Sequence, residues 1–164
     1  MAGILDWFDH VCPRFVSPIG GFIYLIFLTY GVHFASAGIY VSIRGTYDLA
    51  HPRKQDQRGV LKGYMGGVYD RLRSAHQNCF EALIVVGGAL VMAMQQNVDA
   101  EVISSLASLI CLLRTAYCIL YALVESQAIA GLRSLAFLGS LLAALRLLAL
   151  AAAAAGGGAP AVVN

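Results

Sequence analysis

The chain has 164 residues, of which 59% are apolar and only 12% are charged, and its mean hydropathy is +0.73. A soluble domain carries about 25% charged residues, so this composition excludes an ordinary water-soluble domain and indicates a surface that faces lipid or other apolar helices. The formal net charge of +2 is too small to suggest nucleic acid as a partner.

The first predicted span covers residues 19–43, within a segment from Phe15 to Ile43 that contains no Asp, Glu, Lys or Arg. At a rise of about 1.5 Å per residue, such a helix is long enough to cross a hydrocarbon layer of about 30 Å. The residues before it lack the positively charged start of a secretory signal.

Residues 44–73 form the one long polar segment. Pro52 and several glycines within it favour a loop with turns over a second domain. The segment contains seven of the eleven basic residues of the chain: Arg44, Arg53, Lys54, Arg58, Lys62, Arg71 and Arg73.

Three further spans are predicted at residues 74–97, 102–124 and 132–153, joined by short loops at 95–101 and 125–131. From residue 151 to 164 the chain is a low-complexity tail of mainly alanine and glycine, which we expect to be frayed. We therefore predict an all-α, integral membrane four-helix bundle that forms a single domain over residues 1–164.

The positions of the basic residues predict the orientation in the membrane. Basic residues concentrate in the 44–73 loop, and Arg133 lies near the 125–131 loop, whereas Arg14 lies on the other side. The positive-inside rule then places both loops in the cytoplasm and both termini on the non-cytoplasmic side.

Arginines inside the spans are the most informative residues, because a charge at mid-membrane costs about 2.5–3.5 kcal/mol even on insertion scales. Offsets of three and four residues place two polar sets on single helical faces. The first set is Arg71, Ser74, Asn78 and Glu81, and the second is Arg114, Tyr117, Tyr121 and Glu125.

These faces allow two interpretations. Arginines with tyrosine and asparagine suit a cleft, open to the cytoplasmic side, for a small anionic, peptide-like ligand. Alternatively, Arg114 pairs with Glu81 or Glu125 and only holds the bundle together. Periodicity does not decide between them.

The four cysteines form neither a CxxC pair nor the spacing of a zinc site. Three of them, Cys79, Cys111 and Cys118, lie in apolar stretches, and we interpret these as free, buried thiols. We predict no metal site.

Residues 71–81 read RLRSAHQNCFE, which resembles the second-helix signature R-x-x-R-A-H-x-N-x-x-E of the MAPEG family, the membrane-associated proteins in eicosanoid and glutathione metabolism. Arg114-x-x-Tyr117-x-x-x-Tyr121, followed by Leu-Arg-Ser-Leu at 132–135, resembles the later signatures of that family. The resemblance covers roughly residues 15–150, including the four-span layout.

The resemblance implies a homotrimer that binds glutathione in clefts between subunits and acts as a glutathione transferase or peroxidase on hydrophobic electrophiles or lipid hydroperoxides from the bilayer. Membrane lipid is a further expected partner, and a eukaryotic chain would lie in the endoplasmic reticulum or another organelle membrane. By position, the resemblance assigns Arg133, Tyr121 and Arg114 to the thiolate as catalytic residues. It assigns glutathione binding to Arg71, Arg73, Asn78, Glu81, Tyr117 and, more loosely, Arg44.

Ser74 departs from the pattern, because many family members have an arginine there, although Arg73 is adjacent. Arg146 lies in the fourth span and matches no motif. The main alternative to an enzyme is a non-catalytic member of the family, either a lipid-binding scaffold or an accessory subunit of a larger membrane complex. A transporter is a third reading, but the sequence has no inverted repeat and no pair of broken helices.

Overall fold

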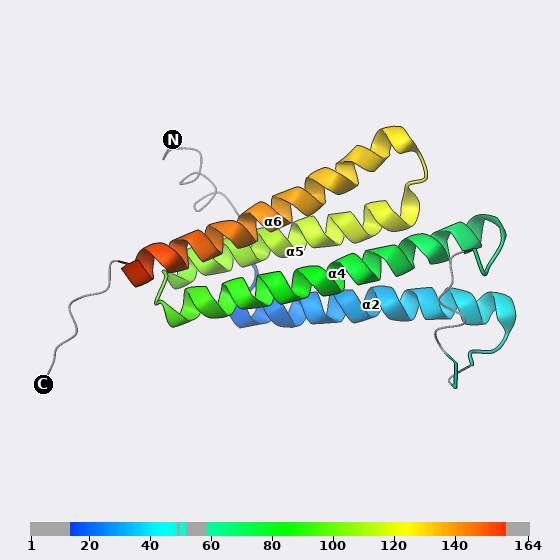
Figure 1. Ribbon diagram of the computed structural model, residues 1–164, viewed down its shortest axis with the longest axis horizontal. Coiled ribbons are helices and arrows are strands. Elements are labelled where there is room, and N and C mark those ends of the chain that lie inside the picture. Colours follow the sequence, from blue (N-terminus) through cyan, green and yellow to red (C-terminus); the bar gives the residue numbers. More distant parts are fainter. Residues whose placement is uncertain (1–13, 49, 52–58, 157–164) are drawn as a thin grey trace, which may run out of the picture.

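The computed structural model describes residues 14–48, 50–51 and 59–156 (Figure 1). Within these residues the chain is all helical, with no strand, and its helices are α2 (Pro18–Arg44), α4 (Gly63–Gln95), α5 (Ala100–Leu123) and α6 (Gln127–Gly156). All four are long and apolar enough to cross a membrane. The expected all-α fold with four apolar helices is confirmed.

Successive helices run in opposite directions, so α2 begins and α6 ends toward the same end of the bundle (Figure 1). Helices α4 and α5 form the centre, because each packs against the other and against both α2 and α6. No contact joins α2 to α6 in the described part of the chain. The α4–α5 pair is therefore the element that can position a site.

Helix α2 has well-defined ends, close to those of the first predicted span. The side chain of Ser17 accepts a hydrogen bond from the backbone N–H of Gly20, and Pro18 occupies the first turn. At the other end Gly45 adopts a left-handed conformation with φ of 78°, and its N–H donates to the carbonyl of Val41. This arrangement is a common helix C-terminal cap.

Helix α4 begins at Gly63, so residues 63–73 are helical and the prediction of a loop over 44–73 is wrong there. The glycines that suggested turns include Gly66, which is required inside the first turn of the helix. A Cβ at residue 66 would lie 2.3 Å from the carbonyl oxygen of Leu61. We interpreted this glycine as a turn residue, but it instead allows close packing of the backbone.

The connections on either side of α5 are short. Helix α5 begins after Asp99, whose side chain accepts a hydrogen bond from the N–H of Glu101. Only residues 124–126 separate α5 from α6, so the predicted 125–131 loop is too long.

Helix α6 continues to Gly156, and residues 151–156 are helical where a frayed tail was expected, because alanine has the highest helix propensity. The rest of the predicted tail, 157–164, lies outside the described residues.

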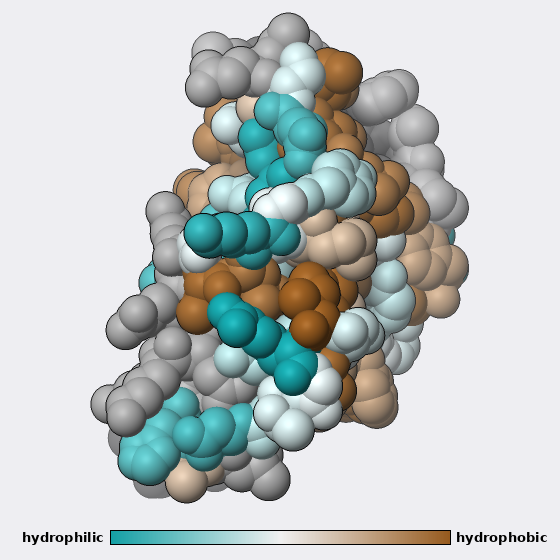
Figure 2. Space-filling model, turned by 90° about the vertical axis from the view of Figure 1, so that its right-hand side faces the viewer, coloured by the Kyte–Doolittle hydropathy of each residue, from teal (hydrophilic) through white to brown (hydrophobic). Residues whose placement is uncertain are grey.

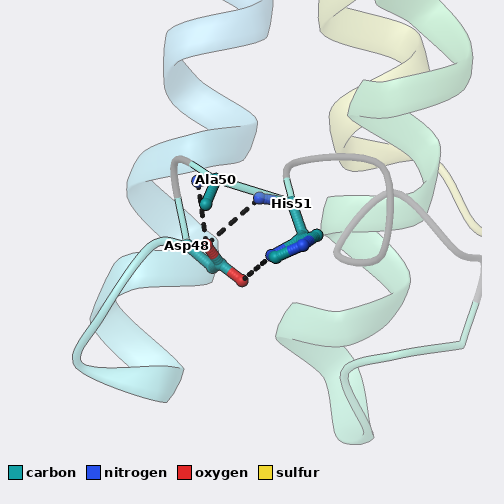
Figure 3. Close-up of polar contacts among 3 residues, drawn as sticks. All are labelled: Asp48, Ala50 and His51. Atoms are coloured by element: carbon teal, nitrogen blue, oxygen red, sulfur yellow. Dashed lines mark hydrogen bonds and ion pairs between the residues drawn. The ribbon is translucent and has the colours of Figure 1, made fainter.

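Just after α2, the side chain of Asp48 contacts the residues that follow it (Figure 3). Its Oδ1 atom accepts hydrogen bonds from the backbone N–H groups of Ala50 and His51, at 2.9 and 3.1 Å, and its Oδ2 atom lies 3.3 Å from Nδ1 of His51. Asp48 and His51 are exposed, so the interaction shapes the turn and adds little stability.

The bundle interior consists of two apolar clusters. One joins the C-terminal halves of α4 and α6 to the N-terminal half of α5 and contains several alanines, among them Ala89, Ala93, Ala107 and Ala144. The other lies nearer the opposite end and includes Leu72, Ala75, Cys79, Tyr117 and Cys118. Small residues allow the helix backbones to approach closely, which is the usual mode of helix packing in membranes.

The outer surface of the helices is apolar. Large hydrophobic side chains such as Phe27, Ile84 and Leu135 are more than 60% exposed, which a water-soluble monomer rarely tolerates. The end that carries the α2–α4 and α5–α6 connections differs, because hydrophilic side chains spread across it among hydrophobic ones (Figure 2). This distribution is that expected of helices in lipid whose ends reach water.

Candidate functional site

A cavity of about 390 Å³ lies between α4, α5 and α6. Asn78 comes from α4, Tyr117 and Tyr121 from α5, and Arg133 from α6. The complete lining is Asn78, Tyr117, Tyr121, Ala130, Arg133, Ser134 and Phe137. Four residues proposed from the sequence therefore share one cavity.

The polar side chains of this cavity are held in place by one another. The Nδ2 atom of Asn78 donates a hydrogen bond of 2.5 Å to the hydroxyl of Tyr117, which joins α4 to α5. The rings of Tyr117 and Tyr121 lie 5.1 Å apart, and the guanidinium of Arg133 lies over the ring of Tyr121 at 4.7 Å. A cation over an aromatic face is attracted by the ring quadrupole, so α6 presents its cation directly to Tyr121 of α5.

Arg71 lies about two helical turns before Asn78 on α4 and connects α4 to the end of α5. Its Nη1 atom donates to Glu125 at 2.8 Å, and its Nη2 atom donates to the carbonyl of Ala122 at 3.2 Å. The arginine side chain is 17% exposed and the glutamate 55% exposed. Arg71 thus neutralises the carboxylate that the sequence had offered as a partner for Arg114.

Arg114 is the most unusual residue of the bundle. It is only 3% exposed, and its Nε and Nη1 atoms have no hydrogen-bond partner in the described part of the chain. Its guanidinium lies 4.8 Å from the ring centre of Phe137 and 5.6 Å from that of Tyr117. The described residues contain no ion pair between Arg114 and Glu81 or Glu125, so the pairing alternative is not supported by the geometry.

A smaller cavity of about 170 Å³ is lined by both Arg114 and Glu81 and otherwise by apolar residues. Buried polar groups are almost always hydrogen-bonded. The free N–H groups of Arg114 therefore constitute a donor set that an anionic ligand group could satisfy.

Arg73 and Glu81 face a second, separate hollow on the outer side of α4. It has a volume of about 450 Å³ and is lined by Asp70, Arg73, Ser74, His76, Gln77, Phe80 and Glu81. The single polar face expected on this helix is thus divided between the cavity that Asn78 lines and this outer hollow. The reason is geometric: side chains three and four residues apart differ by tens of degrees around the helix, so Asn78 turns toward α5 while Ser74 and Glu81 border the outer side.

Arg44 does not join either cavity. It is exposed at the end of α2, and its Nη2 atom donates to the carbonyl of Val60 at 2.9 Å. In this position it holds the segment before α4 against the end of α2.

Sequence reasoning did not identify Phe137 as a site residue. Phe137 lies one helical turn after Arg133, and its ring contacts the guanidinium of Arg114. The i, i+4 spacing from Arg133 was the available signal, but a phenylalanine in an apolar span gives no other indication of its role. His76 also borders the outer hollow, and its Nδ1–H donates to the carbonyl of Thr29 on α2.

Comparison with family models identifies a match to the MAPEG family over residues 20–153. Comparisons with curated proteins and with solved structures give no match. The matched segment contains all four helices nearly in full and every residue of the cavity between α4, α5 and α6. With four membrane-length apolar helices, the protein is an integral, multi-pass membrane protein, and it belongs to the MAPEG family.

Proposed function

We propose that the protein is a membrane-bound glutathione transferase or peroxidase that acts on hydrophobic electrophiles or lipid hydroperoxides. The observation that carries the proposal is the cavity between α4, α5 and α6, where Arg133 lies over Tyr121 beside the hydrogen-bonded pair of Asn78 and Tyr117. Its donors are of the type that binds carboxylates and thiolates. Family membership supports glutathione as the ligand.

Glutathione would supply the thiol that reacts with the lipophilic substrate. A free thiol has a pKa near 8.5, so little thiolate is present at neutral pH. Arg133 and the hydroxyl of Tyr121 would donate to the sulfur and stabilise its negative charge. Arg114 would assist with N–H groups that the described residues leave unpaired.

The remaining proposed contacts require a second copy of the chain. Arg73 and Glu81 line the outer hollow of α4, which α5 and α6 of the same protomer do not enter. In a homotrimer, this face of one subunit would meet the Asn78–Arg133 cavity of its neighbour. Arg71 and Arg73 would then bind the glutathione carboxylates and Glu81 the amino group.

We further propose that the end with the α2–α4 connection is cytoplasmic. Arg44, Lys62, Arg71 and Arg73 lie at this end, and Arg14 lies at the other. That asymmetry follows the positive-inside rule. An organelle membrane such as the endoplasmic reticulum would then hold the protein in a eukaryotic cell.

The test is the stability and spectroscopy of the purified full chain in detergent. A ligand that binds only the folded state stabilises it by RT ln(1 + [L]/Kd), or about 1.4 kcal/mol at ten times the Kd. Millimolar glutathione should therefore raise the melting temperature and produce a thiolate absorbance band. Arg133→Ala should abolish the band while the protein remains folded.

Arg14→Ala is the matched control, because Arg14 pairs with Glu101 at the opposite end of the bundle. It should retain both the band and the stabilisation. A thiolate band that persists in Arg133→Ala would overturn the role assigned to Arg133. The absence of any stabilisation at millimolar glutathione would overturn the enzyme proposal.

The second candidate is a non-catalytic scaffold or accessory subunit. The pairs Arg71–Glu125 and Asn78–Tyr117 favour it, since polar groups that satisfy one another can serve helix packing alone. The unpaired N–H groups of Arg114 oppose it. Under this function the protein melts at the same temperature with and without glutathione.

A further inference from the structure

Two buried cysteines on different helices lie in direct contact. Cys79 of α4 is 4% exposed and Cys118 of α5 is 5% exposed, and both are free thiols. Their Sγ atoms lie 3.4 Å apart. A disulfide has an S–S distance of about 2.05 Å, so the two sulfurs need to approach by only about 1.4 Å to form a bond.

The surroundings of Cys79 supply a polar group and a small crevice. Cys79 and Arg114 line the same small crevice between α2, α4 and α5, with a volume of about 10 Å³. A cavity of about 10–15 Å³ is the smallest that holds one water molecule, so the larger hydrogen peroxide molecule reaches Cys79 only when the side chains that line the crevice move aside. The unpaired Nε and Nη1 groups of Arg114 can donate hydrogen bonds to an oxygen that develops negative charge.

We propose that Cys79 and Cys118 form a peroxide-driven dithiol–disulfide site inside the bundle, distinct from the cavity of Tyr121 and Arg133. Hydrogen peroxide is the oxidant. The Cys79 sulfur attacks one peroxide oxygen, the O–O bond breaks, and the leaving hydroxide takes the thiol proton and departs as water. The Cys118 sulfur then attacks the sulfenic acid of Cys79, and a second water leaves as the S–S bond forms. Two thiols are oxidised by two electrons, and one peroxide is reduced to two waters.

The third described cysteine shows that burial alone does not create this site. Cys111 is 1% exposed, but its Sγ atom contacts the carbonyl of Gly21 at 3.6 Å and has no second sulfur beside it in the described chain. Cys111 is therefore a matched internal control on the same helix as Cys118.

The disulfide would alter the neighbouring cavity between α4, α5 and α6. Cys79 directly follows Asn78 and Cys118 directly follows Tyr117, and these two polar residues form the α4–α5 wall of that cavity. A covalent link one residue away would fix the separation of the two helices at this wall. Oxidation by peroxide would therefore change the cavity at the wall where α4 and α5 meet.

The experiment uses the full chain in nanodiscs, without glutathione. After a hydrogen peroxide titration, the remaining thiols are alkylated under denaturing conditions and the peptides are mapped by mass spectrometry. We expect a linked peptide pair containing Cys79 and Cys118 that dithiothreitol separates, while Cys111 is recovered as the alkylated thiol. In Cys118→Ala, dimedone should label Cys79, because no second thiol resolves the sulfenic acid.

Recovery of both Cys79 and Cys118 as alkylated thiols at a peroxide concentration that already oxidises Cys111 would overturn the proposal. So would an equal yield of the link in the SDS-unfolded chain, because the folded juxtaposition would then not be its cause. The linked peptide pair is measured in the wild-type chain. A folding defect in Cys118→Ala would therefore not affect that measurement. Because glutathione is absent, the result is independent of the proposed enzyme function.

Discussion

At the scale of single residues, the hydrogen bond between Asn78 and Tyr117 decides how α4 and α5 meet at the cavity. Asn78 is partly buried and Tyr117 is 3% exposed. In water such a bond competes with solvent, whereas between membrane helices each partner would otherwise be left unsatisfied or find a weaker partner. The residue types were evident in the sequence, but their pairing depended on the rotation of the two helices.

A double-mutant cycle should measure this pairing. We expect Asn78→Ala and Tyr117→Phe each to lower the free energy of unfolding, with a coupling energy of about 0.6–1.7 kcal/mol, from the average to the maximum found for hydrogen bonds between membrane helices. Equilibrium unfolding in mixed detergent and SDS micelles gives the four values. Strictly additive effects would show that the two side chains do not interact.

At the scale of elements, the start of α4 is set by backbone packing. The sequence places several glycines between residues 59 and 67, and we interpreted them as turn residues. The structure uses Gly66 to let the carbonyl of Leu61 pass the first turn of the helix, and α4 therefore extends eleven residues further toward its N-terminus than the predicted span. A glycine that permits close approach and one that permits a turn look identical in a sequence.

Gly66→Ala should therefore be destabilising. The added Cβ would clash with backbone atoms of Leu61, which cannot move aside as the end of a flexible side chain can. Overpacking of this kind costs about 1–3 kcal/mol. Gly88→Ala on the same helix is the control, since a Cβ there meets nothing within 4 Å. It should be neutral or stabilise the protein by up to about 1 kcal/mol. Thermal unfolding in detergent compares the two, and equal melting temperatures would contradict the assigned role of Gly66.

At the scale of the whole molecule, one apolar surface surrounds a bundle whose charged residues are concentrated at its ends and in a few buried positions. Helix α4 has 33 residues and is about 50 Å long at 1.5 Å per residue, which exceeds a hydrocarbon layer of about 30 Å. Its two ends must therefore reach water on opposite sides of the membrane. The basic residues at the N-terminal end of α4 predict that this end is cytoplasmic.

Labelling of an introduced, exposed cysteine tests the orientation. In a background in which Cys12 is replaced by serine, Lys62→Cys should react with a membrane-impermeant maleimide from the cytoplasmic side and Gln95→Cys from the opposite side. Cys79, Cys111 and Cys118 are buried, so the background protein should remain unlabelled. The reverse pattern would contradict the orientation, and labelling of both positions from one side would contradict the four-span topology.

The sequence by itself determined that the chain is an all-helical membrane protein, because four long apolar segments in lipid have few alternatives to helices that satisfy their own backbone hydrogen bonds. Its motifs also indicated the family. Only the tertiary structure decided which polar residues meet. Asn78, Tyr117, Tyr121 and Arg133 share a cavity, and Arg71 rather than Arg114 pairs with Glu125. Arg73 and Glu81 line the hollow on the outer side of α4. Spacing along one helix fixes a face relative to that helix alone. The contact partner of that face depends on how neighbouring helices rotate and pack, which is also why the contact between Cys79 and Cys118 could not be predicted.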